Sequence, residues 1–438
     1  MRQLLVYILI PVLAIIGIIY PFYGLCSYMV INILRPEMFF WGGHTGNILF
    51  NVTIGSTLLG FIAVLVGIRT APLNNLRYLS GCREFWLLLW IWIATVVTLL
   101  LTSYPLHPRS WYYSNELLKL FILGALTLAL VVSKEHIYRF QHIVMTAVTL
   151  LSIWGIEQRF RGNERLEGLG GSAFGDSNGV AAFGVLYLPI ALNMFLTVNK
   201  TKEKLLWLFS FVVIALLVIL TQSRGGLLGL IAALLYLLLR TRRKGMLLLF
   251  AGLAALIFTF TSLQTGDTFK RFEQFASGEE LDYSGASRIV LWKAGLLIFK
   301  DHPFIGVGLL NFADAKAPYR YALADSEDPA LLDYSFAGYK VGHGTFFAQI
   351  MPEGGLLLTI PYLWLIIQLF IGAYRMRKTN RHLSDPNLHD LLVGLQAGVV
   401  GNCVCNIFIN NLFMYFLPIQ ILIGGQIIRQ LQQHVNPQ

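Results

Sequence analysis

Residues 205–240 read LLWLFSFVVIALLVILTQSRGGLLGLIAALLYLLLR. Two apolar runs, 205–221 and 225–240, flank a short polar turn that carries Arg224. About 20 apolar residues are enough for a helix to cross the hydrocarbon core of a bilayer. This stretch therefore predicts two transmembrane helices joined by a tight turn, with a permanent positive charge at one end of the pair.

The same kind of apolar run recurs along the whole chain. Of its 438 residues, 56% are hydrophobic and only 13% are charged, about half the charged share of a soluble domain. This composition excludes a soluble enzyme with one ordinary core, and it excludes intrinsic disorder. The sequence predicts an all-α polytopic membrane protein with about twelve spans, at 3–33, 47–68, 84–102, 114–133, 140–154, 178–197, 205–221, 225–240, 245–263, 344–372, 389–407 and 409–428. The first run contains Pro21 and is either one kinked helix or two.

Basic residues predict the orientation of these spans. Cytoplasmic loops of membrane proteins carry an excess of Lys and Arg. Sixteen basic residues fall in five loops that share one side in the twelve-span arrangement, near 69–83, 134–139, 200–204, 240–244 and 375–381. We assign that side, with both termini, to the cytoplasm. The formal net charge of +10 is then a topology signal, and we expect no nucleic-acid partner.

The longest segment between spans is residues 264–343, between the ninth and tenth helices and on the opposite side. It divides the chain into a first part, 1–263, with nine helices, a large periplasmic loop or cap, 264–343, and a last part, 344–438, with three helices and a cytoplasmic C-terminus. Long loops in compact proteins are usually functional. Within this loop, residues 288–299 are amphipathic and predict a helix beside the membrane.

The turn Thr221–Gly226 is the first motif that could carry chemistry. Ser223 is placed to cap the following helix, so that Arg224 would lie beside free N–H groups and the positive end of the helix dipole. Arginine is always charged and holds phosphate bidentately. The sequence therefore predicts an anion site here. The alternative is an interfacial arginine whose side chain reaches lipid headgroups.

Two further motifs lie in and after the long loop. Ser287 follows small residues and is placed to cap a predicted helix, with Arg288 in its first turn. A salt bridge to Glu279, Glu280 or Asp282 is the alternative role for that arginine. His343 stands where the loop re-enters the membrane, a position at which an ionisable residue indicates function. A neutral imidazole can accept a proton from a hydroxyl. The alternative is a structural histidine that bonds a backbone carbonyl.

Weaker candidates lie on the same outer side. Arg159, Arg161 and Arg165 precede the glycine-rich run 168–175 and could add positive charge to an anion site, or could belong to a solvated loop. Asp325, Glu327, Asp328 and Asp333 form an acidic cluster that favours a solvated patch over metal binding. Four cysteines are too few for a disulfide scaffold. No Walker loop, zinc spacing or dinucleotide fingerprint is present, so we expect no metal and no cofactor.

Together, these motifs resemble the O-antigen ligase and O-antigen polymerase superfamily. The matching residues are Gln222–Gly225, Ala286–Arg288 and His343. Residues 303–308 and the stretch from His343 to Gly354 are also similar, as is the layout of about twelve spans with the large loop after the ninth. Residues 34–41 resemble the exosortase-associated O-glycosylation ligase branch.

The resemblance implies a metal-independent, inverting glycosyltransferase of the bacterial inner membrane, active in lipopolysaccharide biosynthesis. The family transfers a glycan from an undecaprenyl-pyrophosphate donor on the periplasmic face, and the expected acceptor is lipid A–core. Arg224 and Arg288 would bind the pyrophosphate and stabilise the charge of the leaving group, with Arg159 and Arg161 beside them. His343 would position or deprotonate the acceptor hydroxyl.

Three rival functions remain open from the sequence. An O-antigen polymerase or a protein O-oligosaccharyltransferase would use the same donor with another acceptor. A flippase or transporter would instead carry ionisable residues inside its spans and broken helices in two repeated halves. The main charges within the predicted spans, Glu116 and Lys119, lie near a helix end, which favours surface catalysis over translocation. The sequence does not define the acceptor, the glycan structure or the oligomeric state.

Overall fold

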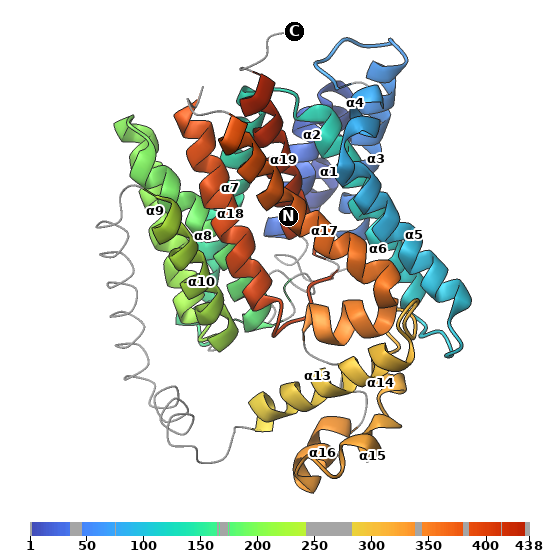
Figure 1. Ribbon diagram of the computed structural model, residues 1–438. Coiled ribbons are helices and arrows are strands. Elements are labelled where there is room, and N and C mark those ends of the chain that lie inside the picture. The colour runs from blue at the N-terminus through green and yellow to red at the C-terminus, as the bar shows by residue number, and fades with distance from the viewer. Residues whose placement is uncertain are drawn as a thin grey trace.

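The computed structural model (Figure 1) describes residues 2–35, 46–74, 76–163, 166, 174, 176–241, 283–337, 344–379, 385–412 and 414–433. Across these ranges the regular structure is helical, with no strand. The predicted all-α class is therefore confirmed. Long helices form a bundle, and a group of short helices lies across one end of it (Figure 1).

Eight helices in the described ranges are long and apolar enough to cross a membrane. They are α3 (Gly46–Leu65), α5 (Arg83–Leu101), α6 (Ser110–Leu130), α7 (Lys134–Phe160), α8 (Ser177–Thr197), α9 (Thr201–Leu220), α18 (Pro386–Cys405) and the pair η3 (Thr345–Ile350) with α17 (Met351–Thr379). Four other apolar helices complete this part of the bundle: α1 (Arg2–Ile19), α2 (Pro21–Leu34), α10 (Arg224–Arg240) and α19 (Phe416–Gln433). The predicted span 245–263 lies outside the described residues, so the count of twelve stays a prediction.

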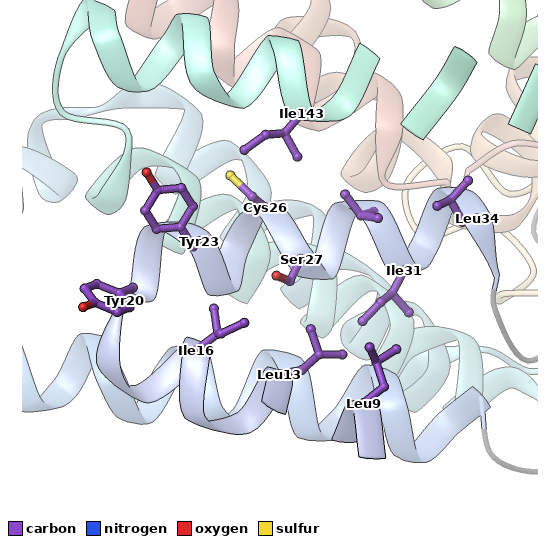
Figure 2. A pocket seen from close by; sticks show the side chains of 11 residues that line it. Leu9, Leu13, Ile16, Tyr20, Tyr23, Cys26, Ser27, Ile31, Leu34 and Ile143 are labelled. Carbon is purple, nitrogen blue, oxygen red and sulfur yellow. The ribbon is translucent and has the colours of Figure 1, made fainter. Parts of the chain in front are cut away.

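The first apolar run forms two helices. α1 ends at Ile19 because Tyr20 leaves the helical conformation (φ −129°, ψ 78°) and Pro21, which has no N–H to donate, starts α2. The two helices fold back on each other, with Leu9 beside Ile31 and Tyr20 at the turn (Figure 2). The first apolar run is therefore two helices and not one kinked helix.

The basic loops gather at one end of the bundle. The helices α5, α7, α9 and α18 begin at this end, and α10, α17 and α19 finish there (Figure 1). We call this end the basic face. The described Lys and Arg residues of the predicted basic loops there are Arg69, Arg77, Arg83, Lys134, Arg139, Lys200, Lys202, Lys204, Arg240, Arg375, Arg377 and Lys378. Arg429 of α19 lies at the same end, where it pairs with Glu84 of α5. The opposite end, which carries the short helices, is the cap face. The predicted separation of basic loops from the long insertion is therefore seen in the fold.

The two ends of the described chain point to opposite faces. α2 ends near the cap face, where the Arg35 guanidinium lies 4.6 Å from the centre of the Phe50 ring at the start of α3. Since α1 runs antiparallel to α2, its first residues point the same way, whereas α19 ends at the basic face (Figure 1). This geometry does not support the prediction that both termini share one side.

Helix α8 is the centre of the bundle, and every residue from Val180 to Leu196 is buried. Small residues allow α18 and α10 to pack closely against it and against each other. A Cβ added at Gly398 would lie 2.0 Å from the Leu186 carbonyl oxygen, and one at Gly401 would lie 2.6 Å from the Gly229 oxygen. This tight contact fixes the start of α10, which carries Arg224, against α18.

Four helices form the described part of the insertion: α13 (Tyr283–Asp301), α14 (Phe312–Ala315), α15 (Tyr319–Leu323) and α16 (Pro329–Phe336). We call this group the cap. α13 lies across the ends of the bundle helices (Figure 1) and contains the predicted amphipathic helix 288–299. Leu291 and Ile298 pack toward Phe312, while Val290 and Ala294 pack against Leu332 of α16.

The acidic cluster of the insertion holds the cap together. Glu327 pairs with Lys293 of α13, and Asp333 pairs with Arg320 of α15. Asp328 caps α16 by accepting from the Ala330 and Leu331 N–H groups. Three of the four acidic residues therefore have a structural role within the cap, where the sequence had favoured a solvated patch.

A neighbouring contact in the cap joins α13 to α15. Tyr319 donates a hydrogen bond to Asp301 Oδ2 at 2.8 Å. Burial, followed by this bond to a carboxylate, raises the pKa of Tyr319 above its ordinary range, so the phenol stays protonated.

Candidate functional site

The turn between α9 and α10 is built as the sequence predicts. Gln222 adopts a left-handed conformation (φ 53°), which reverses the chain after α9. Ser223 then caps α10: its Oγ accepts from the Gly226 N–H at 3.0 Å and donates to Asn178 Oδ1 at 2.7 Å. Arg224 is the first residue of α10 and its side chain is exposed at the cap face. The helix dipole and a guanidinium thus act at one point.

The glycines after Arg224 bring the turn against another part of the chain. A Cβ at Gly225 would lie 3.3 Å from Phe408, which belongs to the loop 406–415 between α18 and α19. A Cβ at Gly226 would lie 2.6 Å from the Ala181 Cβ of α8. Gly226 therefore needs a residue without a side chain, and a side chain at Gly225 would have to displace Phe408 slightly, because the start of α10 is wedged between α8 and this loop.

Arg288 lies on α13, although not in its first turn. The helix is described from Tyr283, so Ser287 is inside it and is not its N-cap; the predicted cap was wrong. The predicted start relied on the serine, whereas the helix includes the small residues that precede it. Ser287 is buried and Arg288 is half-buried. Its alternative partners Glu279, Glu280 and Asp282 lie outside the described residues.

Trp292 connects the Arg288 helix to the Arg224 turn. It follows Arg288 by one helical turn and therefore lies on the same face of α13. Its ring centre lies 5.8 Å from that of Phe408 and 5.6 Å from that of Phe347 in η3. Because Phe408 also touches Gly225, the two arginine-bearing helices meet at one aromatic side chain.

The third predicted residue, His343, lies outside the described residues, but the next residue does not. A Cβ at Gly344 (φ 117°) would lie 3.0 Å from Trp292 Nε1 and 2.4 Å from the Ile407 oxygen. The Gly344 N–H donates to Asn410 Oδ1 at 3.0 Å. The chain that follows His343 therefore enters the bundle beside the same tryptophan and the same loop.

A buried polar network anchors this entry point. Thr345 Oγ1 donates to the Ile409 carbonyl and accepts from the Asn411 N–H, each at 2.7 Å. Asn411 donates to Asn406, and Asn406 to Asn402 of α18. These bonds hold residues 406–412 out of a helix. The predicted span 409–428 was therefore wrong at its start, and α19 begins at Phe416.

Replacing Thr345 by valine tests this anchor. Valine keeps the shape but removes the hydroxyl, which leaves a buried N–H unpaired at a cost of about 1–3 kcal/mol. We expect kcat for the transfer reaction that the resemblance implies to fall with little change in the KM for the donor, because Thr345 holds the chain after His343 and is on neither of the arginine-bearing helices. The control is Thr359→Val in α17, since the buried Thr359 hydroxyl has no hydrogen-bond partner among the described residues. Equal activity of the two variants would contradict the anchoring role.

Helix α17 is broken where it passes the cap. Gly355 has φ 58° and ψ −158°, a conformation open essentially to glycine alone. The backbone groups freed there bond to residues 303–308: Val307 N–H to Pro352 O at 2.9 Å, Gly308 N–H to Glu353 O at 3.0 Å, Leu356 N–H to Pro303 O at 2.7 Å and Leu357 N–H to Phe304 O at 3.0 Å. Residues 303–308 and 352–357, which we call the junction, thus dock the cap into a membrane helix.

The junction contains a buried carboxyl group. Glu353 is 1% exposed, and its Oε1 accepts from the Phe312 N–H at 3.3 Å. Thr102, at the end of α5, donates to the Val307 carbonyl at 2.6 Å, and Ser110, at the start of α6, donates to the Leu309 carbonyl at 2.8 Å. Side chains from three bundle helices therefore fix the loop that follows α13.

The remaining predicted arginines lie at the cap-face end of α7. Arg161 is exposed and pairs with Glu157 one turn earlier, and Arg159 is half-buried. Arg165 lies outside the described residues, with most of the glycine-rich run. The structure thus places two of these arginines on the predicted face. Neither takes part in the contact at which Phe408 joins the Arg224 turn to the Arg288 helix. No group of His, Cys, Asp and Glu in the described ranges could hold a metal ion.

Several site residues were not predicted from the sequence. Asn178, Trp292, Phe408 and Glu353 connect distant segments, and no local pattern gives such contacts. One signal was available: Asn402, Asn406, Asn410 and Asn411 interrupt an apolar run, and polar residues at membrane depth are expensive and usually functional.

Part of the chain is similar to a known protein family. Residues 209–339 match the family model described as O-antigen ligase. No curated protein matches the chain. The matched segment contains both Arg224 and Arg288, and it supports the predicted resemblance to the O-antigen ligase superfamily. Members of this family are O-antigen ligases or polymerases, so the finding supports a membrane glycosyltransferase-type enzyme.

Proposed function

We propose that this protein is an O-antigen ligase of the bacterial inner membrane. It transfers a glycan from undecaprenyl-pyrophosphate to lipid A–core at the cap face. The observation that carries the proposal is the meeting of three segments at Phe408 and Trp292: the Arg224 turn, the Arg288 helix and the chain that follows His343. This is the arrangement that a lipid-linked pyrophosphate needs at a membrane surface, because its charge must be matched where its tail enters the bilayer.

Arg224 and Arg288 hold the donor pyrophosphate in this proposal. Arg224 works together with the free N–H groups at the start of α10. When the acceptor hydroxyl attacks the anomeric carbon, the bond to the pyrophosphate oxygen breaks and its electron pair stays on the leaving group. The guanidinium groups stabilise that charge, so no metal ion is required. Arg159 and Arg161 lie further out and add positive charge near the donor.

His343 receives the proton of the acceptor hydroxyl. Attack from the side opposite to the pyrophosphate inverts the configuration of the anomeric carbon. The segment after His343 is fixed by Asn410 and Thr345, and holding a catalytic group in the right geometry lowers the barrier of the step that it assists. The cap face is then periplasmic, and the basic face, with the end of α19, is cytoplasmic according to the charge rule.

One assay distinguishes this function from its rivals. Purified protein is given a carrier-linked glycan together with three competing acceptors: lipid A–core, a second carrier-linked chain and a pilin-type peptide. Glycan on lipid A–core is the expected product. Elongation of the carrier-linked chain would instead identify a polymerase, and glycosylated peptide a protein O-oligosaccharyltransferase. Movement of the intact donor across proteoliposomes without transfer would identify a flippase and overturn the proposal.

A further inference from the structure

An apolar groove lies in the wall of the bundle, far along the chain from the arginine site. It runs between α1 and α2 and has a volume of about 560 Å³. The walls are formed by Leu9, Leu13 and Ile16 of α1, Cys26 and Ile31 of α2, and Ile143 of α7 (Figure 2). Such a surface inside a membrane protein suits a hydrocarbon chain.

The end of the groove at the basic face is polar. Tyr20 and Tyr23 stand at the hairpin turn (Figure 2), as amphipathic rings do at a membrane–water interface. Arg139 Nη1 donates to the Tyr23 hydroxyl at 3.4 Å, and Arg69 Nη1 donates to the Ile18 carbonyl at 3.3 Å. Two exposed guanidinium groups are thereby held within three residues of the turn.

Arg139 is aligned with the groove by the helix that carries it. Ile143 follows Arg139 by one turn of α7, so both side chains lie on one face of that helix. Because Ile143 lines the groove, Arg139 stands at its mouth. The other charged residues near the start of α7 are Lys134, which pairs with Asp385 at 3.7 Å, and Glu135. His136 stacks on Phe22 at 4.3 Å between ring centres.

We propose that this groove binds one anionic phospholipid from the leaflet at the basic face. The lipid phosphate lies between Arg139 and Arg69, and an acyl chain follows the groove toward Leu34. From Tyr23 to Leu34, α2 rises by about 16 Å, which is close to the ~15 Å depth of one leaflet. This match favours a phospholipid over the longer prenyl chain of a carrier lipid. The inference does not depend on the proposed function.

Native mass spectrometry of the full chain in mild detergent tests the proposal, with phosphatidylglycerol and phosphatidylcholine as probes. The wild type is expected to retain one phosphatidylglycerol and to release phosphatidylcholine more readily. Arg139→Gln should weaken phosphatidylglycerol retention about fivefold, since a basic residue near a membrane surface contributes about 1 kcal/mol to anionic lipid binding. Ser27→Trp fills the groove and should abolish retention of both lipids.

Two matched controls keep the test specific. Arg77→Gln removes a charge from the basic face on α4 (Leu76–Gly81), and Leu235→Trp enlarges an exposed side chain on α10; both should retain lipid as the wild type does. Unchanged retention by Arg139→Gln overturns the proposal without relying on the groove-filling variant. Retention of a carrier lipid in place of the phospholipid, or a second copy of the chain over the groove, overturns it as well.

Discussion

Arg224→Ala and Arg288→Ala are each expected to lower kcat/KM for glycan transfer by at least about 10²–10³, the usual effect of removing one group that stabilises charge in a transition state. The two arginines are on helices that meet at Phe408, and in the proposed function both bind one pyrophosphate. His343→Ala should also abolish transfer, through the loss of the proton acceptor. Glycan transfer by each purified variant is measured with a carrier-linked glycan as donor. The amount of folded protein is measured in parallel, so that a loss of folding is not mistaken for a loss of activity.

Arg161→Ala is the matched control for these substitutions. Its guanidinium is exposed and already pairs with Glu157, so its removal should change kcat/KM by less than about tenfold, as expected for a surface charge. Arg224→Lys keeps the charge but loses the bidentate geometry. Its kcat/KM should therefore lie between that of the wild type and that of Arg224→Ala. If Arg224→Ala, Arg288→Ala and His343→Ala all retained activity, the site would lie elsewhere in the molecule.

Gly355→Ala is expected to destabilise the protein by about 3 kcal/mol or more and to abolish transfer. An alanine would have to adopt φ 58° and ψ −158°, which costs about 1–3 kcal/mol. Its Cβ would also lie 2.5 Å from the Phe304 carbonyl carbon, and such overpacking costs a similar amount. The junction would open and α13, with Arg288, would lose its support. Thermal unfolding in detergent and the transfer assay measure both effects.

Gly55→Ala serves as the control for this glycine. It lies in α3, where an added Cβ meets nothing within 4 Å, so the change should be neutral or stabilising by less than about 1 kcal/mol. A Gly355→Ala variant with the Tm of the wild type would show that the break in α17 is not needed for the fold.

Local features of the site were predictable from the sequence. The two apolar runs around Thr221–Gly226 become α9 and α10, and Ser223 caps the second of them, because runs and caps are properties of neighbouring residues. The amphipathic residues 288–299 become part of α13 for the same reason. The basic loops share one face, as expected where the cytoplasmic loops of a membrane protein carry an excess of Lys and Arg.

Features that depend on distant contacts were not predictable in this way. The run 344–372 looks like one continuous span, yet it contains a π-helix and a break at Gly355. The backbone groups freed by that break are paired by residues 303–308, which lie more than forty positions earlier in the chain. The loop 406–415 was assigned to a helix because its apolar residues outnumber its asparagines, whereas hydrogen bonds to Thr345 decide its path.

The junction also limits how the enzyme can exchange its substrates. Residues 264–343 were expected to form a cap, and a cap that opened in each reaction cycle would have to break the junction. Four main-chain hydrogen bonds join residues 303–308 to α17, and leaving such buried groups unpaired costs about 1–3 kcal/mol each. Lifting the cap at this edge would therefore cost on the order of 10 kcal/mol, so the lifted state would be populated at only about one part in 10⁷. In the proposed function, α13 is then a fixed roof, and we expect a lipid-linked donor that diffuses in the plane of the membrane to reach Arg224 from the side, beneath this helix.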